Sequence, residues 1–173
     1  APDYSSCSWA YENTTGEAAS FAAGGSIDLS EEFSKDPAVG TYSYAVMLIG
    51  KDFLIKGKYG PVGGLTYYST ETFESSSTDI DDYKTTEAPL NSFGGSGNCT
   101  AYTEDEVVTG GTISAYLLNS TGTMLKNNSS LSKCIGQVKL LGVMNMSTDL
   151  NIAETTKGLK MTFTVTNNGM SVL

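Results

Sequence analysis

Six asparagines of the chain open an Asn-x-Ser/Thr tripeptide, in which the asparagine amide nitrogen accepts an N-linked glycan. The pattern is met by six of the ten asparagines, whereas the Ser/Thr content alone predicts about two or three. This excess indicates a glycoprotein with its acceptors at the surface. Two of the tripeptides overlap, so one acceptor of that pair is expected to be used. The six acceptors are Asn13, Asn98, Asn119, Asn127, Asn128 and Asn145.

The second kind of residue able to do chemistry is cysteine, and the chain contains three: Cys7, Cys99 and Cys134. In the oxidising compartment that glycan acceptors imply, two of them are expected to pair. We favour Cys99–Cys134, because this pair closes the shorter loop and leaves the N-terminal segment unconstrained. Cys7 then stays a thiol or links to another molecule, and the sequence leaves the pairing itself open.

Two missing residue types exclude several classes of function. The chain contains no His, which removes Ser-His-Asp and Cys-His catalysis and most zinc and copper sites. All ten basic residues are lysines and the net charge is −9, so nucleic-acid binding and binding to an anionic membrane surface are not expected. We therefore predict a protein that is not an enzyme, with no cofactor and no metal.

Carboxylates offer two alternatives. Paired acids such as Asp81, Asp82, Glu104 and Glu106 are the tools of glycosidases, but their Ser/Thr-rich surroundings favour solvated loop charges. Calcium binding by residues 79–82 or 104–106 is the other alternative, although the full EF-hand pattern is absent.

Exposed aromatic rings could also bind sugars. Trp9, Tyr11, Tyr67 and Tyr68 would suit the flat face of a pyranose, although half-buried strand tyrosines explain the same pattern.

The elements that would carry these residues are mostly β-strands. Apolar and polar residues alternate strictly over 159–166, and 42–49, 53–56, 65–68, 112–118 and 138–144 are further strand candidates. Residues 50–52 are expected to turn the chain so that 53–56 pairs with 42–49 as a hairpin. One short helix is expected at 30–35. The spacing of strands and turns predicts an all-β fold, a single Ig-like or jelly-roll-like β-sandwich.

The chain is expected to form one domain over residues 21–173, preceded by an N-terminal arm over 1–20. Residues 69–100 are rich in Ser, Gly and Asp and predict a long surface loop, with a linker between two halves as the alternative. The start at Ala1 is typical of a chain from which a signal peptide has been removed. No hydrophobic stretch reaches the length of a membrane helix, so membrane insertion is not expected.

Residues 20–29 carry a family resemblance. Their sequence, SFAAGGSIDL, resembles the TFAAGTLDL strand near the start of the TasA and camelysin proteins, with one residue inserted around Gly25 and Ser26. That family also has an aromatic strand ending in Asn-Asn-Gly soon after this segment, whereas here the similar stretch lies at 163–169. The resemblance implies a secreted β-sandwich that polymerises into fibres by passing a terminal strand to the next subunit.

Two functions follow as expectations. The first is a structural subunit of an extracellular filament or surface coat, a homopolymer in which residues 1–20 are the donated strand. The second is a monomeric secreted binding protein, such as a lectin, adhesin or effector, which binds carbohydrate or another partner through residues 69–100.

Overall fold

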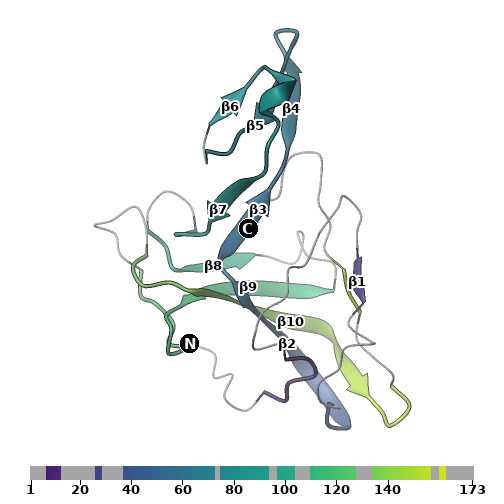
Figure 1. Cartoon of the computed structure of the whole chain (residues 1–173). Helices are drawn as coiled ribbons and strands as arrows, with labels where there is room; N and C mark the ends of the chain where they lie inside the picture. The colour runs from purple at the N-terminus through teal and green to yellow at the C-terminus, as the bar shows by residue number, and fades with distance from the viewer. Residues whose placement is uncertain are drawn as a thin grey trace. The chain divides into compact units, whose positions relative to one another are not determined.

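Strands make up most of the ordered elements of the protein, as seen in a computed structural model (Figure 1). The structure describes residues 7–12, 26–28, 37–72, 75–93, 97–103, 110–127, 134–156 and 160–162. Within these ranges there are eleven strands, one short 3-10 helix and no α-helix. The prediction of an all-β, β-sandwich-like fold is therefore confirmed.

Four sheets contain these strands. The largest has the order β2-β10-β9-β8, a three-stranded sheet has the order β4-β5-β6, and β1-β11 and β3-β7 are two-stranded. The pairs β1-β11, β3-β7, β4-β5 and β5-β6 are antiparallel. The elements are β1 (Ser26–Asp28), β2 (Gly40–Gly50), β3 (Asp52–Ile55), β4 (Lys58–Val62), β5 (Leu65–Ser69), β6 (Ser76–Ser77), the 3-10 helix η1 (Ile80–Asp82), β7 (Thr86–Pro89), β8 (Thr100–Thr103), β9 (Gly111–Leu118), β10 (Lys139–Ile152) and β11 (Lys160–Thr162).

The chain divides into two compact units. Unit 1 consists of residues 1–46, 103–113 and 143–173, and unit 2 consists of residues 47–102 and 114–142. The divisions fall within β2, β8, β9 and β10, so each unit is built from separate segments of the chain.

The hydrophobic core described here lies in unit 2. Its buried cluster consists of Phe93, Cys99, Ala115, Leu117, Cys134 and Leu140. The next residue of each sheet strand, Leu118 on β9 and Leu141 on β10, is also fully buried. Because neighbouring residues of a strand point to opposite faces, this part of the sheet is covered on both faces, as in the interior of a sandwich.

A tight hairpin joins β4 and β5. Gly63 and Gly64 both have positive φ, at 58° and 82°, which is what a two-residue turn of the primed type needs and what a side chain would oppose. The register pairs Tyr59 with Tyr67 and Val62 with Leu65, and it shifts between these pairs. The hairpin therefore places two tyrosines side by side on one face.

The expected hairpin between 42–49 and 53–56 is wrong. Strand β2 pairs with β10, and β3 pairs with β7, with Phe53 opposite Ala88. Only Lys51 separates β2 from β3, and the shortest common hairpin loop has two residues. The chain therefore does not fold back on β2 after Lys51. The Lys51 carbonyl instead accepts a hydrogen bond from the Leu90 amide at 2.9 Å.

The segment predicted as one long loop, 69–100, contains ordered elements: β6, η1 and β7. The aromatic ring of Tyr83, just after η1, lies 5.3 Å from that of Tyr68, and the Lys56 ammonium sits 4.6 Å from its centre. These contacts fix the segment against β5, which its polar composition did not indicate.

Several expectations fall outside the described residues. They are the helix at 30–35, the ends of the strand at 159–166, most of the N-terminal arm and the domain boundary at residue 20. Within the described ranges, no helix is long and apolar enough to cross a membrane.

Candidate functional site

The centre of the candidate site is a disulfide between Cys99 and Cys134, the pair that the sequence favoured. Their Cα atoms are 5.9 Å apart, which is within the usual range for a disulfide. Both residues belong to the core cluster, with exposed fractions of 0% and 2%. The bond therefore lies in the interior of unit 2 and joins the residue before β8 to the segment that leads into β10.

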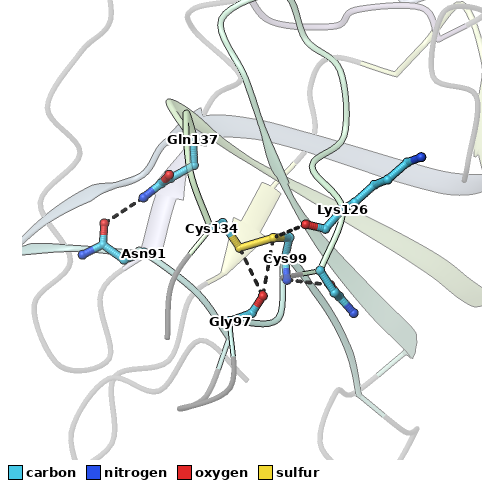
Figure 2. The surroundings of a disulfide bond; sticks show 7 residues. Asn91, Gly97, Cys99, Lys126, Cys134 and Gln137 are labelled. Atoms are coloured by element: carbon cyan, nitrogen blue, oxygen red, sulfur yellow. Dashed lines mark hydrogen bonds between the residues drawn. A yellow bond between two sulfur atoms is a disulfide. The ribbon is translucent and has the colours of Figure 1, made fainter. Parts of the chain in front are cut away.

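Two carbonyl oxygens approach the sulfur atoms (Figure 2). The Gly97 oxygen is 3.7 Å from both sulfurs, and the Lys126 oxygen is 3.0 Å from Cys99 Sγ. Because disulfide sulfurs carry no proton, these are polar contacts and not hydrogen bonds. They show how tightly residues 97 and 126 pack around the bridge.

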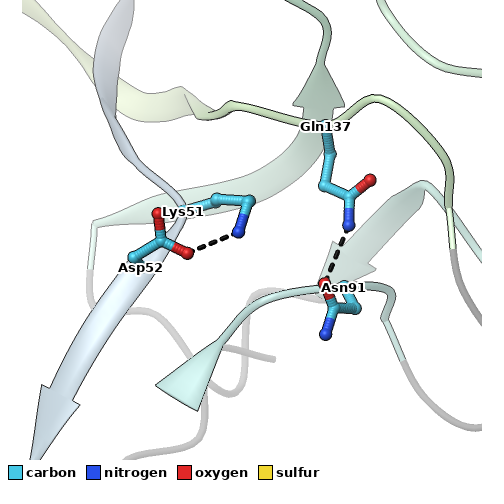
Figure 3. Close-up of polar contacts among 4 residues, drawn as sticks. All are labelled: Lys51, Asp52, Asn91 and Gln137. Atoms are coloured by element: carbon cyan, nitrogen blue, oxygen red, sulfur yellow. Dashed lines mark hydrogen bonds and ion pairs between the residues drawn. The ribbon is translucent and has the colours of Figure 1, made fainter. Parts of the chain in front are cut away.

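Asn91 anchors the Cys134 side of the bridge (Figure 3). Its carbonyl accepts a hydrogen bond from the Cys134 amide at 2.8 Å, and its side-chain oxygen accepts one from Gln137 Nε2 at 2.8 Å. Figure 3 also shows the ion pair between Lys51 and Asp52, at the start of β3. Residues 134–137 are thus held to the chain just after β7 by both backbone and side-chain bonds.

The acceptor Asn98 is adjacent to the disulfide. Its side chain is half-buried, and its carbonyl accepts a hydrogen bond from the Phe93 amide at 2.7 Å. Cys99, the middle residue of its tripeptide, accepts a hydrogen bond from the Leu117 amide at 2.9 Å. The third residue, Thr100, opens β8. The middle residue of this tripeptide therefore lies in the core, and Asn98 and Thr100 are half-buried beside it.

The acceptor Asn119 has a different setting, in the turn after β9. Its side-chain oxygen accepts hydrogen bonds from the Thr121 amide at 3.0 Å, the Thr121 hydroxyl at 2.7 Å and the Thr123 amide at 2.9 Å. Every one of these partners lies within four residues, so the turn is closed by local bonds. Ser120 and Thr121 are exposed.

The acceptors Asn127 and Asn145 are both exposed. The side-chain oxygen of Asn127 accepts a hydrogen bond from the Cys99 amide at 2.7 Å, which brings two acceptor tripeptides against the same cysteine. No pattern in the sequence indicated this bond, because it joins residues far apart in the chain. Asn145 lies within β10, and Asn13 and Asn128 lie outside the described residues.

The other candidate groups are not brought together. Asp79 caps η1 by accepting a hydrogen bond from the Asp81 amide at 3.0 Å. Among the described residues there is no group of three or more His, Cys, Asp or Glu that could hold a metal ion. Residues 104–106 fall outside that part of the chain.

The candidate sugar-stacking residues divide between the two units. Trp9 and Tyr11 belong to unit 1 and are half-buried, whereas Tyr67 and Tyr68 belong to unit 2. Among the aromatic residues of unit 2 whose exposure the structure describes, Tyr59 is the most exposed, and the hairpin register places it opposite Tyr67.

Comparison with known proteins gives no match: no family model, no curated protein and no solved structure is similar to this chain.

Proposed function

We propose that this protein is a secreted, glycosylated structural subunit of an extracellular filament or surface coat, and that subunits associate by adding a β-strand to the outer edge of β2. The observation that carries the proposal is the character of that edge. Strand β2 is eleven residues long, stands at the end of the four-stranded sheet, and contains no charged residue and no proline.

An edge of this kind is unusual because proteins normally guard their sheet edges against pairing with another chain. Among the strands that the structure describes, the other edges carry such guards. Strand β4 contains Lys58 and Pro61 and has an irregular register, and β7 contains Glu87 and Pro89. Strands β6 and β8 have only two and four residues. Strand β2 alone combines length with the absence of all these features.

The surface of β2 is also suited to a partner. None of its eleven residues is buried, and Tyr44 is 61% exposed. For a chain of net charge −9, an uncharged strand is the place where two copies can approach with the least repulsion. Addition of a strand would satisfy the outward backbone groups and cover the half-buried residues 45–49.

The donated strand in this proposal is the N-terminal segment 1–20 of a neighbouring copy. It carries Tyr4, Trp9 and Tyr11 as apolar anchors. The resemblance of residues 20–29 to the TasA and camelysin family points in the same direction, because subunits of that family pass on a terminal strand.

The test is assembly of the native protein after charge is placed on the edge. Thr41 and Ser43 are exposed and share one face of β2, so lysines there leave the fold intact. We expect Thr41→Lys/Ser43→Lys to weaken association about tenfold, since lysines on an edge strand oppose pairing with another strand and unfavourable cross-strand pairs cost about 0.2–1 kcal/mol each. Negative-stain microscopy and sizing of secreted protein provide the measurement.

The matched control is Ser120→Lys/Thr155→Lys, which changes the net charge equally at two exposed turn residues. This control should assemble as the wild type does. A wild-type protein that remains monomeric at high concentration, or a control that dissociates as readily as the edge variant, would contradict the proposal.

A second candidate function, a secreted carbohydrate-binding protein, is favoured by the hairpin. Tyr59 is 70% exposed and pairs across the strands with Tyr67, which gives two adjacent rings suited to a pyranose face. We expect Tyr59→Ala to abolish any signal of the monomer on a glycan array, with Tyr44→Ala as the control on an equally exposed ring in unit 1. A signal that survives Tyr59→Ala would exclude this site.

A further inference from the structure

One residue of the acceptor tripeptide at Asn98 also forms the disulfide. The tripeptide is Asn98-Cys99-Thr100, and its middle residue is the fully buried partner of Cys134. Figure 2 shows Gly97, Lys126 and Cys134 next to Cys99. In a chain with this bond closed, Asn98 is half-buried and fixed next to a fully buried residue.

Three hydrogen bonds hold this tripeptide in place, a local one to Phe93 and two long-range ones to Leu117 and Asn127. The Phe93 amide donates to the Asn98 carbonyl, the Leu117 amide donates to the Cys99 carbonyl, and the Cys99 amide donates to Asn127 Oδ1. Releasing the tripeptide requires the loss of all three bonds together with part of the core. The turn at Asn119 needs only the loss of bonds within residues 119–123, so it opens far more readily.

Two modification reactions act on these residues. In glycan transfer, the Asn Nδ2 forms a bond to the anomeric carbon of a polyprenyl-phosphate-linked oligosaccharide, the carbon–oxygen bond to the phosphate breaks, and Nδ2 loses a proton. In disulfide closure, the Cys99 and Cys134 thiols lose two electrons and two protons to a protein disulfide that is reduced to a dithiol. The first reaction needs an accessible acceptor segment, and the second buries it.

We infer that closure of the Cys99–Cys134 disulfide ends the availability of Asn98 for glycan transfer, so that the occupancy of Asn98 is set by which reaction comes first. This inference rests on the proposed function only in that the chain is secreted and glycosylated. Asn119 stays open to transfer before and after closure. The disulfide thereby adds to the difference between Asn98, whose middle Cys already makes it the poorer acceptor, and Asn119.

The experiment measures glycan occupancy at each asparagine in the Cys7→Ser/Cys134→Ser variant, with Cys7→Ser as the reference. Both proteins keep the tripeptide Asn98-Cys99-Thr100, and removal of Cys7 prevents a substitute disulfide. Occupancy is measured by peptide mass spectrometry on the total protein, both secreted and retained in the cell. The occupancy of a variant that fails to fold is therefore measured as well. In a second arm, cells that produce the wild-type protein are treated with a thiol reductant.

We expect both arms to raise the occupancy of Asn98 about tenfold, while Asn119 and Asn145 stay unchanged. Asn145 is the control for a general delay in folding, because it lies in β10, outside the loop that the disulfide closes. No change at Asn98, or an equal rise at Asn145, overturns the inference. Wild-type protein with bare Asn119 and Asn145 overturns the premise of glycosylation instead, which is a distinct result.

Discussion

Replacing Cys99 and Cys134 together by alanine is expected to lower the free energy of unfolding by about 4 kcal/mol, the loop-closure entropy for a span of about 35 residues. The sequence separation of the two cysteines is 35 residues, and both side chains are buried in the core cluster of unit 2. The lost sulfur contacts add to the entropic loss. Urea denaturation of both proteins under non-reducing conditions measures the difference.

The control for this variant is Cys7→Ala. Cys7 is half-buried and lies outside the disulfide, so its replacement should cost much less than the double change. A double variant within about 1 kcal/mol of the wild type would show that the bridge contributes little to stability.

Gly111→Ala is expected to destabilise the protein by about 1–3 kcal/mol, because a larger side chain in a closed space forces the backbone to shift. A Cβ atom at this position would lie 2.1 Å from the backbone oxygen of Asn145. Gly111 is buried where β9 begins, and the Gly110 carbonyl accepts a hydrogen bond from the Ser147 amide at 2.9 Å. The obstructing atom is backbone, so no rotamer change can relieve the contact.

Thermal unfolding of Gly111→Ala compared with Gly50→Ala tests this prediction. Gly50 ends β2, and a Cβ atom there would meet nothing within 4 Å. Its replacement should change stability by no more than about 0.5 kcal/mol. Equal stability of the two variants would mean that β9 and β10 do not approach as closely as the structure has them.

The sequence predicted the strands well wherever alternation or an apolar run extends over several residues. The candidates 42–49, 65–68 and 112–118 lie within β2, β5 and β9, and the candidate 138–144 begins one residue before β10. Strand β10 continues to Ile152, although residues 147–149 are polar and exposed. Its second half has apolar residues at alternate positions, interrupted by Thr148, and this alternation extends beyond the candidate 138–144: Met144, Met146, Leu150 and Ile152.

Strand partners were harder to predict than strands. The pairing of β3 with β7 joins residues more than thirty positions apart. In β3, Phe53 packs against the core cluster, and its partner strand β7 belongs to a segment predicted to be a loop. Nothing local distinguishes this arrangement from a hairpin except the single residue between β2 and β3.

The candidate site was predictable as a list of residues but not as an arrangement. Loop length was enough to favour Cys99–Cys134 over the two pairs that involve Cys7. The contact between Asn127 and Cys99 and the enclosure of Asn98 are tertiary facts, because they need β8, β9 and the segment before β10 to meet. The tripeptide pattern identifies an asparagine that can accept a glycan, but it does not show whether the folded chain leaves that asparagine accessible.

The Asn119 turn has a consequence for proteolysis. Its exposed residues Ser120 and Thr121 lie between Cys99 and Cys134 in the chain, and loop tips of this kind are preferred cleavage points. A protease that cuts there produces two fragments that the bridge still joins. The two halves of the nicked protein therefore stay covalently joined until a reductant separates them.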